Sequence, residues 1–135
     1  MKTENPYKEA MRYIENAKQI LKLAGIEGKF YKDVKYVQSA CGIAYLGALK
    51  ALDFLFVIKN VPKKRGRKSI EYYQYYLSRI DRKLLNHLNE AYRILHIDGY
   101  YGDIKSLKVI DAGFEQAISI ISYLKPFSKN GLGYK

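Results

Sequence analysis

The sequence predicts an all-α protein with the architecture of an up-down-up-down antiparallel four-helix bundle. Apolar residues recur at spacings of three and four in four separate segments, which is the period of an amphipathic helix. No segment alternates apolar and polar residues over a useful length, as a half-buried strand would. Short connections between the segments favour antiparallel neighbours. We therefore expect helices at residues 5–24, 33–59, 69–96 and 103–125.

The first helix is expected to begin at Asn5, an N-cap residue that precedes a proline at the first helical position. Gly25 follows the last apolar residue of the pattern and provides a stop signal. The second helix is expected to begin after Asp33, which is a good N-cap. The apolar stripe of the first helix comprises Ala10, Ile14, Ala17, Leu21 and Ala24.

The second helix is expected to be the central one, because many of its apolar positions are small. Small side chains allow a neighbouring helix to approach closely. Near the end of this helix, Phe54, Phe56 and Val57 make the surface apolar nearly all round, so the bundle or a partner subunit must cover them. The small residues are Ala40, Gly42, Ala44, Gly47, Ala48 and Ala51.

The third helix is expected to run unbroken from the cap Ser69 to His96, because no glycine or proline lies between them. The stretch IDGYYGD, residues 97–103, is expected to be a turn, and Asp103 or Ser106 then caps the fourth helix. Pro126 should end that helix. The prediction is one bundle domain over residues 1–126, followed by a flexible C-terminal tail at 127–135.

Composition indicates a soluble chain with an excess of positive charge. The 24 basic and 13 acidic residues give a net charge of +11, and six of the basic residues lie in 59–68, which contains no acid. The polar N-terminus does not resemble a signal peptide, and the uncharged run from Tyr36 to Leu49 is too short to cross a bilayer. With a single cysteine, Cys41, no intramolecular disulfide can form. We expect a cytoplasmic protein without a membrane segment.

The basic stretch PKKRGRKS, residues 62–69, is open to two interpretations. It is first a connector between the second and third helices, which mutual repulsion of the lysines keeps in water. It is also a candidate nucleic-acid site, because lysine and arginine side chains bind phosphates. The candidate residues are Lys63, Lys64, Arg65, Arg67 and Lys68.

Histidine and cysteine are too few and too scattered to predict a metal site, and no phosphate-binding loop or cofactor motif is present. His96 is expected at the end of the third helix, where a cation suits the helix dipole, so we interpret it as structural. His87 lies on the apolar seam, where a hydrogen bond to a neighbour such as Glu90 would satisfy its ring. No metal ion or cofactor is predicted.

Tyrosine is abundant, with 14 residues, and four of them crowd into EYYQYYLSRI at the start of the third helix. Tyrosine offers apolar area with a polar tip and is common at protein interfaces. Together with the apolar end of the second helix, this cluster predicts a surface for a homodimer or a protein partner. The candidate interface residues are Phe54, Phe56, Tyr72, Tyr75 and Tyr76.

Two stretches, YKDVKYVQSACGIAYLGALKALD and LLNHLNEAYRILHIDGYYGD, resemble a bacterial family of small helical proteins classed as a domain of unknown function. The resemblance covers most of residues 8–124. It implies a four-helix bundle distantly similar to HEPN-like folds, with no assigned activity. Many HEPN-type bundles are metal-independent ribonucleases with an arginine and a histidine at the spacing of Arg82 and His87.

In that chemistry the histidine acts as a general acid or base on the ribose and the arginine steadies the phosphate. Five residues along a straight helix turn through about 500°, so Arg82 and His87 should point about 140° apart. The interpretation favoured by the sequence is a non-catalytic oligomerisation or partner-docking module. The alternatives are nucleic-acid binding through residues 63–68 and a HEPN-like ribonuclease that uses Arg82 and His87.

Overall fold

The computed structural model describes residues 5–128, and most of them lie in helices, so the all-α prediction is confirmed. A two-stranded antiparallel hairpin joins the first two helices, with strands β1 (Ile26–Glu27) and β2 (Phe30–Tyr31). The predicted flexible tail lies almost wholly outside the described residues. The helices are α1 (Pro6–Lys22), α2 (Val34–Ile58), α3 (Ile70–Ile80), α4 (Arg82–Ala91), the π-helix η1 (Tyr92–Tyr101), α5 (Leu107–Ser122) and the 3₁₀-helix η2 (Lys125–Phe127).

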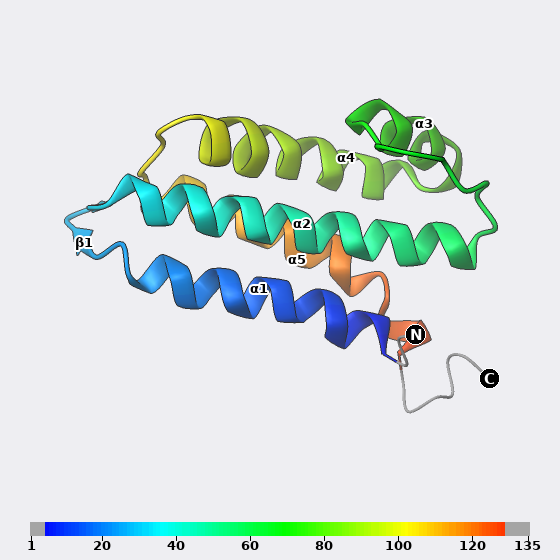
Figure 1. Ribbon diagram of the computed structural model, residues 1–135, viewed down its shortest axis with the longest axis horizontal. Coiled ribbons are helices and arrows are strands. Elements are labelled where there is room, and N and C mark those ends of the chain that lie inside the picture. Colours follow the sequence, from blue (N-terminus) through cyan, green and yellow to red (C-terminus); the bar gives the residue numbers. More distant parts are fainter. Residues whose placement is uncertain (1–4, 129–135) are drawn as a thin grey trace.

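Helix α2 lies in the middle of the molecule (Figure 1). It contacts α1, α5 and η1, whereas α4 packs on α5. The short helix α3 lies beside the start of α4, at the end of the molecule where α2 stops (Figure 1). With five α-helices in the described part of the chain, the predicted four-helix up-down-up-down bundle is not confirmed.

The prediction of one unbroken helix from residue 69 to 96 is wrong, because the chain leaves the helical conformation at Asp81. This residue has φ −162° and ψ 108°, which is extended backbone. Its carboxylate Oδ1 accepts a hydrogen bond from the Leu84 N–H at 2.9 Å, so Asp81 ends α3 and caps α4. An aspartate can compete in this way for backbone donors, and therefore a helix can break without glycine or proline.

The prediction of a turn at residues 97–103 is also wrong over most of its length, since the helical path continues as η1 as far as Tyr101. A hydrogen-bonding pattern of the π type widens the helix. In this wider segment Gly99 lies against α2, where an added Cβ would be 2.6 Å from the Cys41 Sγ atom. Only glycine permits this approach without a shift of the neighbouring chain.

The predicted N-caps are confirmed at Asn5, Asp33 and Ser69, and Ser106 rather than Asp103 caps the last long helix. Helix α5 therefore begins at Leu107 instead of residue 103. It ends at Ser122, and Pro126 lies in the 3₁₀-helix that follows. These caps depend on contacts between residues two or three positions apart, which is why the sequence alone predicts them.

The central position predicted for α2 is confirmed, and small residues make it possible. A Cβ added at Gly47 would lie 2.7 Å from the Tyr13 Cβ atom and 3.2 Å from the Ala10 carbonyl oxygen. Ala40, Ala44 and other alanines of α2 are buried. By length and composition alone α2 could cross a membrane, but half of its apolar window is buried in the protein. That burial is the pattern of a core helix.

The break at Asp81 predicts the sign of a mutational effect. Asp81→Ala should lower the free energy of unfolding by about 1 kcal/mol, because the N-cap of α4 is lost. In an unbroken helix the same change would instead stabilise the protein by about 0.5 kcal/mol, since alanine is the better helix former. Urea unfolding of the wild type, Asp81→Ala and the cap-retaining Asp81→Asn measures the effect. A gain of stability in Asp81→Ala would contradict the break.

Candidate ligand-binding groove

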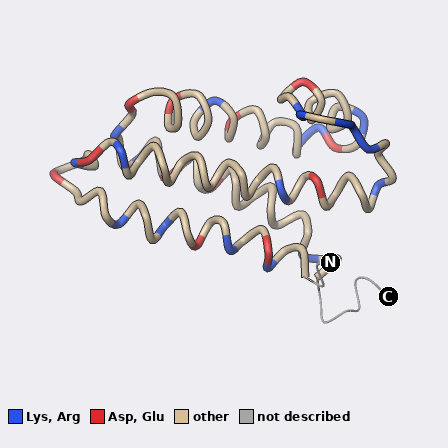
Figure 2. Tube along the Cα trace, in the orientation of Figure 1, with Lys and Arg blue, Asp and Glu red and all other residues tan. Residues whose placement is uncertain are grey.

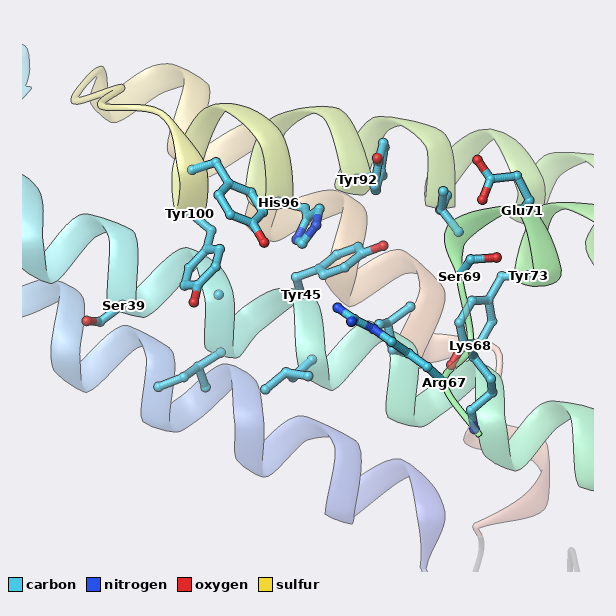
Figure 3. Close-up of a pocket in the computed structure, with 16 residues that line it drawn as sticks. Ser39, Tyr45, Arg67, Lys68, Ser69, Glu71, Tyr73, Tyr92, His96 and Tyr100 are labelled. Carbon is cyan, nitrogen blue, oxygen red and sulfur yellow. The ribbon is translucent and has the colours of Figure 1, made fainter. Parts of the chain in front are cut away.

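A groove of about 890 Å³ lies between α2, η1 and the residues that lead into α3 (Figure 3). Its volume is within the range of small-molecule sites in proteins, which is roughly 300–1,000 Å³. The lining combines aromatic side chains with two cations from residues 62–69, which we call the basic connector. The residues that matter for its chemistry are Tyr45, Arg67, Lys68, Glu71, Tyr73, Tyr92, His96, Tyr100 and Tyr101.

His96 is the centre of an aromatic array in this groove. Its ring stacks on Tyr45 at 4.9 Å between centroids, on Tyr92 at 5.3 Å and on Tyr100 at 6.2 Å, with interplanar angles of 28°, 29° and 11°. Tyr101 meets it edge-on at 5.0 Å. Offset and edge-on contacts between aromatic rings are attractive. The array therefore holds several rings in a fixed arrangement along the groove.

The spacing of η1 explains why these rings meet. Tyr92, His96 and Tyr100 are four residues apart and lie on the same side of the helix, facing α2. Gly42 on α2 gives the Tyr100 ring room, because an added Cβ would be 2.9 Å from its Cδ1 atom. The end of η1 is held by Gln38, whose Nε2 donates to the Gly102 carbonyl at 2.8 Å.

The rings differ in exposure, and this divides the groove into a floor and a rim. Tyr45 is only 6% exposed and forms the floor, whereas Tyr100 and Tyr101 are 47% and 68% exposed. Burial raises the pKa of Tyr45, with a smaller contribution from Tyr92, so its hydroxyl stays protonated. Burial lowers the pKa of His96, and its imidazole is therefore neutral at pH 7.

The basic connector supplies the charged side of the groove. It joins α2 to α3 and carries a cluster of lysines and arginines that Gly66 interrupts (Figure 2). Arg67 extends from it into the groove toward Tyr45 (Figure 3). Among the described residues Arg67 forms no ion pair, whereas the Lys68 Nζ lies 3.0 Å from the Asp53 Oδ1. Lys63, Lys64 and Arg65 are exposed and lie outside the groove lining.

The structure does not bring Arg82 and His87 together within one chain. Arg82 is exposed at the first position of α4, and His87 is half-buried in the same straight segment. The break at Asp81 precedes both residues, so it leaves the angle of about 140° between them unchanged. A hydrogen bond of 2.8 Å joins His87 Nδ1 to Gln116 Oε1, which satisfies the ring as expected, with Gln116 as the partner instead of Glu90.

Part of the predicted partner surface is covered within the chain. Phe56 is only 4% exposed, because the rings of Tyr72, Tyr73 and Tyr76 pack on it at 5.7 to 5.9 Å. Helix α3 thus provides the cover that the apolar end of α2 requires. Tyr75 remains 52% exposed.

Other residues around Phe56 remain partly exposed. Phe54 and Tyr76 are half-buried, and Val57 is 66% exposed. The Arg79 guanidinium lies 4.2 Å from the ring centroid of Tyr75, so even that exposed ring has one face in contact with its own chain. The predicted docking surface is therefore smaller than the sequence indicated.

The groove was not predicted from the sequence, although a local signal was present. His96 was expected at a helix end, where its role would be structural, and the turn predicted after it separated it from Tyr100. The spacing Tyr92-x₃-His96-x₃-Tyr100 would have identified one aromatic face, had the helix been extended beyond residue 96. Tyr45 could not have been included, because its contact with His96 joins two helices that lie far apart in the sequence.

Neither metal chemistry nor thiol chemistry is indicated in the part of the chain that the structure describes. Within residues 5–128 no three His, Cys, Asp or Glu side chains form a group that could hold a metal ion. Cys41 is buried, and burial raises the pKa of its thiol to about 12. A thiol of this kind is unreactive at neutral pH. Cys41 is therefore a packing residue, which contacts Gly99 of η1.

Comparisons with known proteins give a family and a fold without an activity. The family model described as "Domain of unknown function (DUF5618)" matches residues 5–126. A solved structure, a protein of unknown function from Dyadobacter fermentans, is 36% identical with a TM-score of 0.78; the match covers 88% of this chain and 92% of that one. No curated protein matches. The expected resemblance to a domain of unknown function is confirmed, and the relation to HEPN-like bundles stays a prediction.

His96 should titrate below its ordinary pKa of about 6.5, because burial disfavours the imidazolium. The unfolded chain then takes up this proton at a higher pH than the folded chain. His96 therefore contributes a loss of stability as the pH falls below about 6.5. An NMR titration of the imidazole resonances, assigned with His96→Gln, measures the pKa directly. A midpoint at or above 6.5 would mean that the tyrosine rings stabilise the cation more than burial opposes it.

Proposed function

The chain belongs to this family of unknown function (DUF5618), and we propose that it binds single-stranded nucleic acid in the groove. The observation that supports this proposal is the position of the aromatic array beside Arg67 and Lys68 in one groove. Proteins that bind single strands combine aromatic rings, on which bases stack, with cations that follow the phosphates. Both components occur here within one site.

The rim of the array is where bases would stack. Tyr100 and Tyr101 are the exposed rings, and they meet each other edge-on at 4.9 Å between centroids. Their shared contact with His96 holds them in place, so a base would meet rings that are already ordered. Stacking of a base on such a ring contributes about 1–3 kcal/mol.

The basic connector would bind the phosphates of the same strand. Arg67 points into the groove, and Lys63, Lys64 and Arg65 continue the positive charge away from it. A strand whose bases lie on Tyr100 and Tyr101 would carry its phosphates toward this connector. The candidate nucleic-acid site that the sequence predicts in the connector thereby becomes one half of a composite site. We include the expected cytoplasmic localisation in the same proposal.

The groove favours this function over the docking module that the sequence favoured. Part of the surface expected to bind a partner is covered by its own chain, because Phe56 is buried under α3. Docking of a homodimer or another partner through Phe54 and Tyr75 stays a prediction. A ribonuclease centred on Arg82 and His87 gains no support from the geometry of a single chain. We propose a binding role without catalysis.

The charge component predicts a salt dependence that the connector controls. We expect the chain to bind fluorescein-labelled ten-nucleotide strands of thymidine or uridine, with an affinity that falls steeply as salt rises. Changing Lys63, Lys64, Arg65 and Arg67 to glutamine should weaken binding. It should also reduce the slope of log K against log salt by about 0.7 for each phosphate that the variant no longer neutralises. Fluorescence anisotropy at four salt concentrations measures both quantities.

A matched control removes the same charge elsewhere. Lys18, Lys22, Lys29 and Lys35 are all exposed and lie outside the groove. Their change to glutamine lowers the net charge by the same four units and should leave the slope close to that of the wild type. Equal slopes for the two quadruple variants would show that binding follows net charge instead of the connector, which would contradict the proposed site.

The stacking component predicts an effect that depends on an aromatic ring and not on apolar area. Tyr101→Leu should weaken binding of the thymidine strand by about fivefold to 150-fold, which corresponds to the removal of one stacked base at 1–3 kcal/mol. Tyr75→Leu changes a comparably exposed tyrosine outside the groove and should have no effect. Tyr101→Trp should retain binding. If Tyr101→Leu binds the thymidine strand with wild-type affinity, the aromatic array is not part of the binding site.

A further inference from the structure

We propose that Asp53 of α2 is a positioning residue, which fixes the basic connector over the groove so that Arg67 can meet a phosphate. This inference rests on the proposed function of the groove. The experiments below separate the two, because one of them needs no nucleic acid.

The carboxylate of Asp53 is shared between the connector and α3. Its Oδ1 accepts a hydrogen bond from the Tyr73 hydroxyl at 2.8 Å and lies 3.0 Å from the Lys68 Nζ. Both side chains of the ion pair are about one third exposed, at 34% for Lys68 and 32% for Asp53. Burial, followed by the charge of Asp53, raises the pKa of Tyr73, so its hydroxyl remains a donor at neutral pH. One oxygen thus ties two successive segments to α2.

The path of the connector explains why such an attachment is needed. Asp53 lies five residues before the end of α2, or about 7.5 Å along the helix axis. The chain must therefore turn back along α2 after residue 58 to bring Lys68 to Asp53. The turn begins at Asn60, with φ +60°, and Gly66, with φ +76°, changes direction again. At its near end the connector is held by the Val61 N–H, which donates to the Phe56 carbonyl at 2.9 Å.

Between these two attachments the connector is exposed, and the Tyr72 hydroxyl donates a long hydrogen bond of 3.5 Å to the Pro62 carbonyl. Residues 62–69 all lie on the surface, and a Cβ added at Gly66 would meet no atom within 4 Å. The far attachment is Lys68, which directly follows Arg67 in the sequence. Holding Lys68 against α2 therefore fixes the backbone from which Arg67 reaches the groove (Figure 3). Without it, the ordering of this segment would have to occur when a strand binds, at a cost in affinity.

Because Asp53 is negatively charged, the direction in which its removal changes the binding affinity tests the inference. A carboxylate near a site for an anion weakens binding by repulsion, so its removal alone should strengthen binding. Removal of a positioning residue should weaken binding instead. Glu71 provides the comparison, because it lines the same groove, is exposed, and has no ion pair to another described residue.

The binding experiment compares Asp53→Ala, which removes a negative charge beside the groove, with Glu71→Ala, which removes one from its lining. With the ten-nucleotide thymidine strand, Asp53→Ala should raise Kd about fivefold, and Glu71→Ala should leave it unchanged or lower it. The isosteric variant Asp53→Asn, which keeps the shape of the side chain, should fall between wild type and Asp53→Ala. Equal or tighter binding by Asp53→Ala, with wild-type binding intact, would overturn the positioning role.

Limited digestion with trypsin tests the attachment without any nucleic acid. The connector contains Lys63, Lys64, Arg65, Arg67 and Lys68, all of them sites for this protease. Cleavage within 63–68 should be several-fold faster in Asp53→Ala than in wild type or Glu71→Ala, while the rest of the chain resists. Unchanged cleavage would overturn the attachment. General digestion would indicate unfolding, and Asp53→Asn then decides by the same criterion.

The two proposals fail in different ways. If the wild type binds neither the thymidine nor the uridine strand, the proposed function is wrong and the role of Asp53 in binding is wrong with it, even where trypsin shows that Asp53 restrains the connector. If the wild type binds and trypsin cleaves all variants alike, the groove stands and the positioning role is wrong.

Discussion

The close approach of neighbouring segments to α2 is the constraint on which the rest of the structure depends. Three glycines mark it, because a Cβ at any of them would lie within 3.0 Å of a neighbouring side chain: Gly47 beside Tyr13, Gly42 beside Tyr100, and Gly99 beside Cys41. Interiors are packed densely, so a methyl group at these positions would displace the neighbouring side chain or the segment that carries it. The approach sets where α1 and η1 lie, and the position of η1 creates the groove.

The candidate site is a consequence of this packing. Because Gly99 of η1 lies on Cys41 of α2, the π-helix places His96 against Tyr45 of α2. Helix α2 also carries Asp53, near its C-terminal end. Helix α2 therefore supplies the floor of the groove and the attachment of the basic connector. π-Helical segments are rare, and those that occur lie frequently at functional sites. Here the π-helix extends the aromatic face beyond His96 to Tyr100, a residue that the sequence places in a turn.

Local signals in the sequence predicted the caps, the seams and the central place of α2, because each depends on residues a few positions apart. The break at Asp81 was missed since the apolar period continues through it and no glycine or proline marks it. The extension to Tyr101 was missed because it depends on Gly99 meeting Cys41, 58 positions earlier. The basic connector was recognised as a candidate, but its aromatic partners required the fold. Arg82 and His87 had the right spacing without a shared face.

The most direct test of the proposed site is an NMR titration of the ¹⁵N-labelled full chain with the unlabelled ten-nucleotide thymidine strand. We expect amide shifts to concentrate in the last residues of the basic connector and in η1 around His96, Tyr100 and Tyr101. Little change is expected on α1 and α5, away from the groove. Shifts centred on α1 and α5, or none at a saturating concentration of the strand, would contradict the account.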